Sequence, residues 1–182
     1  MKTKKFGTLM LHGAPMPVPQ KPFYRGDVIG FNGTDFEIGD TVEGKELTWL
    51  KVGNLWVCDR NILMGVSWDT LNAKGYVFGK AITIDGNNYK LRCLTGSDGS
   101  EDSYGKGCDN EWDKLMDEYN EDNSLLHYDD MYTICQETDC DYSDYRSVRG
   151  YYSARHYYGY YATSTSTYVA FRPALEELNP AD

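Results

Sequence analysis

The 182-residue sequence has few basic residues and no long apolar run. Lys and Arg together number 18, against 28 Asp and Glu, so the formal net charge is −10. Affinity for nucleic acid depends on basic patches that displace counterions, and anionic membrane surfaces attract the same patches. No apolar run approaches the roughly 20 residues that cross a bilayer. The sequence therefore predicts neither a nucleic-acid partner nor a membrane partner.

Patterns that signal catalysis or metal binding are also missing. There is no CxxC pair, no HExxH, no P-loop and no GxGxxG, and the three histidines are scattered. The five cysteines are an odd number: Cys58, Cys93, Cys108, Cys135 and Cys140. Free and mostly buried thiols are favoured, and a Cys135–Cys140 disulfide is the alternative. We expect no enzyme activity, no cofactor and no metal site.

One acidic loop, residues 96–110, approaches the spacing of a calcium-binding loop. Ser103 stands where the EF-hand loop needs glycine, and Asp109 replaces its bidentate glutamate. A solvated loop is the favoured interpretation.

The residue pattern of the N-terminal third predicts an extended arm followed by short strands. Residues 1–22 are rich in proline and suggest an extended arm, and a cleaved signal peptide is disfavoured because glycines and a histidine break the apolar stretch. Short β-type runs separated by turn residues follow from Phe23 to Val66. We expect residues 1–62 to form an extended arm with a β-rich docking segment.

Local signals are clearest in the middle of the chain. Residues 79–96 alternate around the turn sequence DGNN and predict a β-hairpin. Asn110 caps a helix over about 110–120, whose apolar residues recur at helical spacing. Asp129–Cys135 is either a helical turn or a strand. The four tryptophans lie in apolar-periodic segments and are expected in the core: Trp49, Trp56, Trp68 and Trp112.

The tract from Tyr142 to Tyr168 holds nine of the sixteen tyrosines. Lysine and acidic residues are absent from Arg146 to Phe171, and the intervening residues are rich in Ser, Thr and Gly. Antibody paratopes have this composition, because tyrosine gives a large contact area at low entropic cost. We expect residues 151–168 to present several tyrosine rings on one continuous exposed surface, at the end of the domain opposite the N-terminal arm. The alternative is a Tyr-rich sheet edge without a partner.

Six short motifs occur in an order that carries a resemblance. They are GVSWD at 65–69, YKLRCLTG at 89–96, NEWD at 110–113, RSVRG at 146–150, SAR at 153–155 and FRPALE at 171–176. Together they resemble the C-type-lectin-like domain related to formylglycine-generating enzyme. The likeness is greatest to retroelement-diversified variable proteins and their phage tail relatives. It covers residues 63–178 and implies an α+β fold with short antiparallel sheets.

The resemblance implies roles for particular residues. The implied scaffold residues are Arg149, Gly150, Arg155, Phe171 and Arg172. Of these, we expect Arg149 and Arg172 to be largely buried and hydrogen-bonded. The implied ligand-binding residues are Tyr151, Tyr152, His156, Tyr157, Tyr158, Tyr160, Tyr161 and Tyr168. The reactive cysteine pair of the sulfatase-activating members is missing, since no cysteine follows Cys140. The sugar-binding calcium motifs of animal C-type lectins are missing too.

The expected function is a non-enzymatic phage virion protein of the tail, fibre or surface, which recognises a host-surface protein or glycan. The alternative is a structural virion protein whose tyrosines pack against neighbouring subunits. Expected partners also include other virion subunits and further copies of the chain, with a trimer as one candidate homo-oligomer. The expected location is the virion, and a secreted or cell-surface location is the alternative.

Overall fold

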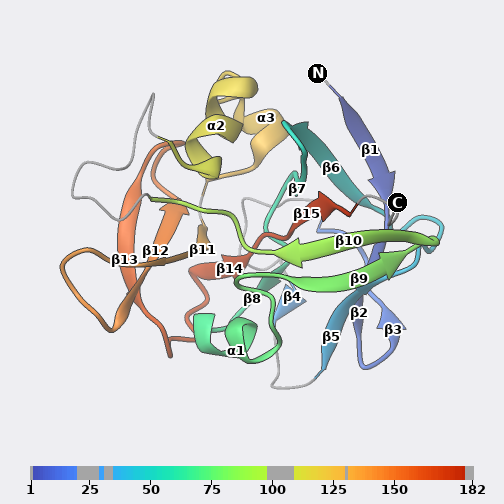
Figure 1. The fold of residues 1–182 in the computed structure, drawn as a ribbon, viewed down its shortest axis with the longest axis horizontal. Helices are drawn as coiled ribbons and strands as arrows, with labels where there is room; N and C mark the ends of the chain where they lie inside the picture. Colours follow the sequence, from blue (N-terminus) through green and yellow to red (C-terminus); the bar gives the residue numbers. More distant parts are fainter. Residues whose placement is uncertain (1, 20–28, 31–34, 98–108, 130, 179–182) are drawn as a thin grey trace.

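The computed structural model describes residues 2–19, 29–30, 35–97, 109–129 and 131–178. It is a mixed α+β fold, built mostly of antiparallel sheets with three helices among the described residues. Figure 1 shows the strands β11–β13 at one end of the long axis and β1–β3 at the other. The Tyr-rich tract thus lies far from the N-terminal strands, as the sequence predicted.

The first sheet has six strands in the order β1-β6-β7-β15-β10-β9, and every neighbouring pair is antiparallel. Its strands are β1 (Thr3–Phe6), β6 (Leu47–Val52), β7 (Leu55–Cys58), β15 (Ala174–Glu177), β10 (Asn87–Arg92) and β9 (Lys80–Ile84). The predicted hairpin is confirmed as β9 and β10. Asp85 and Gly86 both have positive φ, at 49° and 77°, as the tight two-residue turns of hairpins require.

The second sheet also has six strands, in the order β13-β12-β11-β14-β8-β4. Its strands are β13 (Tyr157–Tyr161), β12 (Tyr145–Gly150), β11 (Tyr132–Thr138), β14 (Val169–Phe171), β8 (Leu63–Met64) and β4 (Ile29–Gly30). The segment left open at Asp129–Cys135 is therefore largely strand. A small third sheet joins β3 (Ala14–Pro15), β2 (Thr8–Leu11) and β5 (Phe36–Gly39).

The predicted helix is confirmed as α2 (Glu111–Glu118), capped by the Asn110 side chain, which accepts a hydrogen bond from the Asp113 amide at 2.8 Å. Two short helices that the sequence analysis did not predict are α1 (Trp68–Ala73) and α3 (Asn123–Leu126). Ser67 caps α1 in the same way. None of the described helices is long and apolar enough to cross a membrane.

The prediction of an extended N-terminal arm is wrong for Thr3–Leu11. These residues form β1 and β2, and the side chains of Phe6 and Leu9 are buried in the main core. Phe6 stacks on Trp49 at 5.3 Å, and the Trp49 indole donates to the Phe6 carbonyl oxygen. The expected division at residues 62 and 63 also falls inside one fold, because β15 pairs with β7 in a single sheet.

Tryptophan burial is confirmed, since all four indoles are at most 9% exposed. Trp112 is a residue of α2, and its indole donates to the Ala154 carbonyl oxygen in the turn after β12 at 2.7 Å. The core residue Phe171, one of the implied scaffold residues, is also fully buried and stacks on Tyr76.

The expected scaffold arginines are fully buried, but they differ in their partners. Arg149 on β12 binds both carboxylate oxygens of Asp113 on α2 and the carbonyl oxygens of Gly96 and Arg155. Arg155, the next implied scaffold residue, also binds Asp113 at 3.1 Å. Asp113 itself is fully buried, so a single carboxylate ties α2 to β12 and to the turn that follows β12.

Arg172 is buried and hydrogen-bonded, as expected, but it has fewer partners than Arg149. Its Nη2 donates to the His127 carbonyl oxygen at 2.9 Å, and its guanidinium lies 5.2 Å from the Trp112 ring centre. Its Nε and Nη1 atoms have no hydrogen-bond partner. Complete burial lowers the pKa of Arg172 to about 10, which still leaves the group charged at neutral pH.

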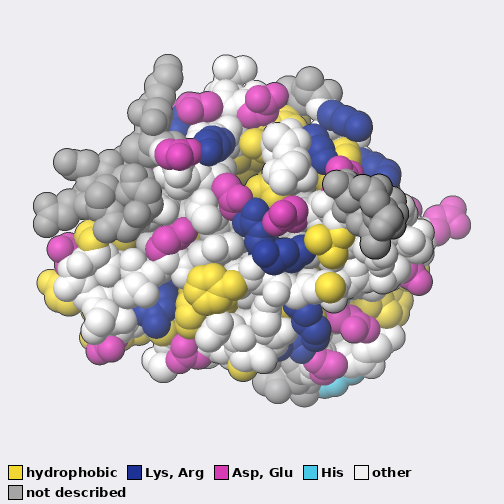
Figure 2. All heavy atoms as spheres, in the orientation of Figure 1, with side chains coloured by type: hydrophobic (Ala, Val, Ile, Leu, Met, Phe, Trp, Pro, Cys, Tyr) yellow, Lys and Arg dark blue, Asp and Glu magenta, His cyan; other side chains and the backbone are white. Residues whose placement is uncertain are grey.

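On the face shown in Figure 2, over β9 and β10, Lys and Arg side chains run between Asp and Glu side chains. Such mixed exposed charge adds little stability, because exposed ion pairs are well solvated and contribute about 0–1 kcal/mol each. The energetically important charges of this protein are therefore the buried ones.

We predict that Arg149→Ala lowers the free energy of unfolding by about 3–5 kcal/mol, because it leaves the buried Asp113 carboxylate without its main partner. Urea unfolding at neutral pH measures the change. The control is Lys114→Ala. The Lys114 side chain is 55% exposed and pairs with Asp109 on the surface, so its removal should lower the free energy of unfolding by only about 0–1 kcal/mol. Equal losses in the two variants would contradict the prediction.

Candidate functional site

The Tyr-rich tract forms the edge of the second sheet. β12 pairs with β13, and β13 is the last strand in the order of the sheet. Side chains alternate between the two faces of a strand. Tyr158 and Tyr160 therefore point to one face of β13, whereas Tyr157 and Tyr161 point to the other.

An open hollow lies on the face that carries Tyr158 and Tyr160. Its volume is about 520 Å³, and its lining is entirely aromatic. We call it the aromatic hollow, and its lining residues are Tyr132, Tyr151, Tyr152, His156, Tyr158, Tyr160 and Tyr168. Six of the eight predicted ligand-binding residues are thus brought together, at the end of the molecule opposite β1.

Tyr132 at the start of β11 is the lining residue that the sequence analysis missed. It is only 6% exposed and forms the floor of the hollow. Its ring packs on Tyr151 at 4.8 Å and on Tyr158 at 5.8 Å, and its hydroxyl is 3.0 Å from Nε2 of His156. The sequence offered little indication of this role, because Tyr132 lies before the Tyr-rich tract and reaches the hollow only through the pairing of β11 with β12.

Neighbouring rings around the hollow lie in different planes. Tyr151 and Tyr168 are nearly perpendicular, at 88° and 5.8 Å between ring centres, and Tyr152 and His156 are also at 88°, with 5.1 Å between ring centres. Edge-to-face contacts of this kind are a favoured arrangement of aromatic pairs. The side chains therefore hold one another in place around an open space.

Two groups in the lining of the hollow, Tyr132 and His156, are held in their neutral forms. Burial raises the pKa of the Tyr132 hydroxyl to about 12. Burial, reinforced by the nearby positive charge of Arg149, lowers the pKa of His156 from its ordinary value. A neutral imidazole beside a neutral phenol is the state that this geometry favours at pH 7.

The backbone at the rim is unusual. Gly150 and Tyr151 both have positive φ, at 88° and 78°, and a tyrosine rarely adopts such a conformation without support. The Tyr151 amide donates to the Tyr128 carbonyl oxygen at 2.8 Å, which supplies that support. A Cβ atom at Gly150 would lie 2.9 Å from the same oxygen, so glycine is required there. Strained residues held in this way cluster at functional sites.

Arg155 fixes the turn between Tyr151 and Tyr157 to helix α2. Besides Asp113, it binds Asp117 at 2.6 Å and Glu121 at 2.7 Å. These carboxylates raise the pKa of Arg155 against the opposing effect of burial, so the cation is permanent. One rim of the aromatic hollow is therefore anchored to a helix by ion pairs.

Two of the implied ligand-binding residues, Tyr157 and Tyr161, do not line the aromatic hollow. Tyr157 points to the opposite face, where its hydroxyl donates to Asp139 at 2.7 Å and lies 3.3 Å from the Ser147 hydroxyl. Tyr161 packs edge-to-face on Tyr145 at 4.3 Å, on that same face. We call Tyr142, Tyr145 and Tyr161 the second tyrosine cluster, because Tyr142 packs on Tyr145 at 5.2 Å. The alternation of strand residues splits the tract.

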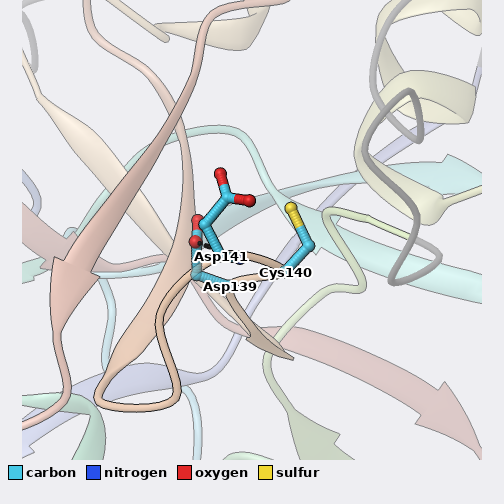
Figure 3. A group of neighbouring side chains, drawn as sticks. All are labelled: Asp139, Cys140 and Asp141. Atoms are coloured by element: carbon cyan, nitrogen blue, oxygen red, sulfur yellow. Dashed lines mark hydrogen bonds between the residues drawn. The ribbon is translucent and has the colours of Figure 1, made fainter.

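The turn after β11 brings Asp139, Cys140 and Asp141 together (Figure 3). Asp139 is already engaged: one oxygen accepts from the amides of Asp141 and Tyr142, and the other accepts from Tyr157. These contacts build the turn, and we assign the group a structural role.

The thiols of Cys58, Cys93 and Cys135 are free and buried, and Cys140 is exposed. Free thiols were the favoured prediction, and no disulfide joins Cys135 to Cys140. Burial raises the pKa of Cys58 to about 12 and raises those of Cys93 and Cys135 as well. Cys108 and residues 98–108 of the acidic loop lie outside the described residues.

Comparisons with protein-family models, with curated proteins and with solved structures found no match.

Glu137 on β11 is linked to Arg149 through the backbone of Gly96. Its carboxylate accepts a hydrogen bond at 2.9 Å from the amide of Gly96, whose carbonyl oxygen in turn accepts from Arg149. Burial raises the pKa of Glu137 from 4.5 to about 7. Because the folded state holds this proton more tightly, its contribution to stability is complete below pH 4.5 and is lost as the pH rises through 7.

We predict that Glu137→Gln is more stable than the parent at about pH 8, by about 1–2 kcal/mol after allowance for solvent screening, and that the difference vanishes by about pH 5. Urea unfolding of both proteins across this range measures it. His127, whose pKa is lowered to about 4, gives the opposite slope, but it is common to both proteins and cancels in the difference. A difference that does not change with pH would contradict the prediction.

Proposed function

We propose that this chain is a non-enzymatic recognition module that binds a host-surface ligand through the aromatic hollow. The observation that carries the proposal is the convergence of seven aromatic side chains on one open hollow. Exposed aromatic surface of this kind is unfavourable in water unless a partner covers it, and such patches usually mark interaction sites. A few rings of this type typically supply most of the energy of a binding interface.

Convergence of the short sequence motifs in space supports a C-type-lectin-like scaffold. Asp113 of NEWD binds Arg149 of RSVRG and Arg155 of SAR. Arg172 of FRPALE lies over Trp112 of NEWD, and Gly96 of YKLRCLTG accepts from Arg149. Motifs spread over some eighty residues of sequence thus contact one another around helix α2. This arrangement is what we expect if the motifs form a common scaffold.

The chemistry of the described residues favours binding over catalysis. The buried thiols are protonated at neutral pH because their pKa values are raised, so they are poor nucleophiles. The lining of the hollow, as far as the described residues form it, consists of six phenols and one imidazole and contains neither a carboxylate nor a lysine. A lining made almost wholly of phenol rings offers a ligand apolar contact area and hydroxyl groups for hydrogen bonds.

A virion protein of a phage tail, fibre or surface is the setting that we propose for this module. Its support is the motif set and the tyrosine-rich rim, both of which resemble the diversified and phage-borne members of the family. In that setting the strands β1–β3, far from the hollow, would face other virion subunits or further copies of the chain.

We predict that Tyr152→Ala combined with Tyr158→Ala weakens binding to target cells at least about tenfold, with little change in the melting temperature. The two side chains are 72% and 51% exposed at the hollow. The matched control is Tyr142→Ala combined with Tyr161→Ala in the second tyrosine cluster, where the exposures are 62% and 56%.

Fluorescently labelled protein is first screened by flow cytometry against a panel of bacterial isolates, and a strain that it stains is used to compare the variants. The control variant should stain that strain like the parent. If no isolate is stained, or if both double variants bind equally well, the hollow is not a host-recognition site.

A further inference from the structure

The aromatic hollow contains no group that neutralises an ammonium ion by hydrogen bonding. Among the described residues, its lining consists of six phenol rings and one imidazole, without Asp, Glu, Asn or Gln. Lysine and arginine side chains carry N–H donors that need acceptors, for which carboxylates are the strongest partners. The described lining offers phenol hydroxyls but no carboxylate for such a cation to pair with. It is therefore poorly matched to lysine and arginine side chains.

A quaternary ammonium group has no N–H donor and a diffuse positive charge. Its interaction with aromatic rings needs only the electron-rich ring faces, within about 6 Å of the ring centre. Several rings in different planes can surround such a group, and the near-perpendicular pairs Tyr151–Tyr168 and Tyr152–His156 supply different planes. The floor ring of Tyr132 closes the hollow from beneath.

The charge of the protein favours the same ligand. A net charge of −10 attracts cations to the surface as a whole and repels anions. Within the hollow, the hydrogen bond between Tyr132 and His156 and the burial of both groups favour a neutral imidazole, which does not oppose a bound cation. None of the described residues that line the hollow is a lysine or an arginine.

We propose that the aromatic hollow binds a quaternary ammonium group of the choline type, carried by the host-surface ligand. The trimethylammonium head sits against Tyr132 between the exposed rings, and the remainder of the ligand leaves through the open side. This inference rests on the proposed function of the hollow and specifies the chemistry that it recognises.

The direct test titrates choline chloride into the purified chain and follows the tyrosine ring protons by NMR. The matched probe is 3,3-dimethylbutan-1-ol, which has the shape of choline with a neutral carbon in place of the nitrogen. We expect choline to bind at least about tenfold more tightly than the alcohol, because only choline gains the interaction with the ring faces. Equal affinities, or no shift with choline, would overturn the proposal.

Variants localise the effect. Tyr158→Phe retains the ring face and should bind choline like the parent, whereas Tyr158→Leu should weaken binding several-fold. Tyr161→Leu in the second tyrosine cluster is the control and should have no effect. If Tyr158→Leu and Tyr161→Leu behave alike while both are folded, the cation does not bind in the hollow.

Cell staining separates this inference from the proposed function. If the Tyr152 and Tyr158 double variant loses cell staining and choline competes with the parent for cells, both proposals stand. If the double variant loses staining but choline neither binds nor competes, the hollow recognises another ligand and only this inference fails. Retention of the chain on phosphatidylcholine vesicles would identify a lipid as the source of the headgroup, and competition by free phosphocholine without such retention would identify a soluble or polymer-borne source.

Discussion

The buried carboxylate of Asp113 is the constraint on which the binding end of the molecule depends. An ionised carboxylate with no exposure to solvent is stable only if cations and hydrogen-bond donors surround it closely. Arg149, Arg155 and Asn110 meet that demand from β12, from the turn after it and from the helix cap. Because these partners come from distant parts of the chain, satisfying one charge fixes the positions of several elements together.

That network has a direct consequence for recognition. Between Arg149 and Arg155 lie Gly150 and Tyr151, whose left-handed backbone conformations turn the chain at the rim of the aromatic hollow. The ion pairs offset the strain of this turn and hold the rings in place before a ligand arrives. A rim ordered in advance loses less entropy on binding, so more of the contact energy appears as affinity.

Elements that depend on short sequence patterns could be predicted, whereas elements that depend on pairing between distant strands could not. The capped helix α2, the β9–β10 hairpin and the buried tryptophans depend on short patterns, and each was predicted. The strands at Thr3–Leu11 were missed because their stability comes from pairing with β6 and β5, more than twenty residues away. Tyr132 was missed for the same reason, since its place in the hollow depends on the order of strands in the sheet.

The division of the tyrosines between two faces shows why composition alone does not define this site. A shift of one residue in the pairing of β13 with β12 would move Tyr158 and Tyr160 out of the hollow and bring Tyr157 and Tyr161 in. Two features on the other face of β13, away from the hollow, oppose such a shift. Tyr157 is bound to Asp139, and a Cβ atom at Gly159 would lie 2.7 Å from the same carboxylate, which would then have to move. The structural face of β13 therefore specifies which tyrosines its other face presents to a ligand.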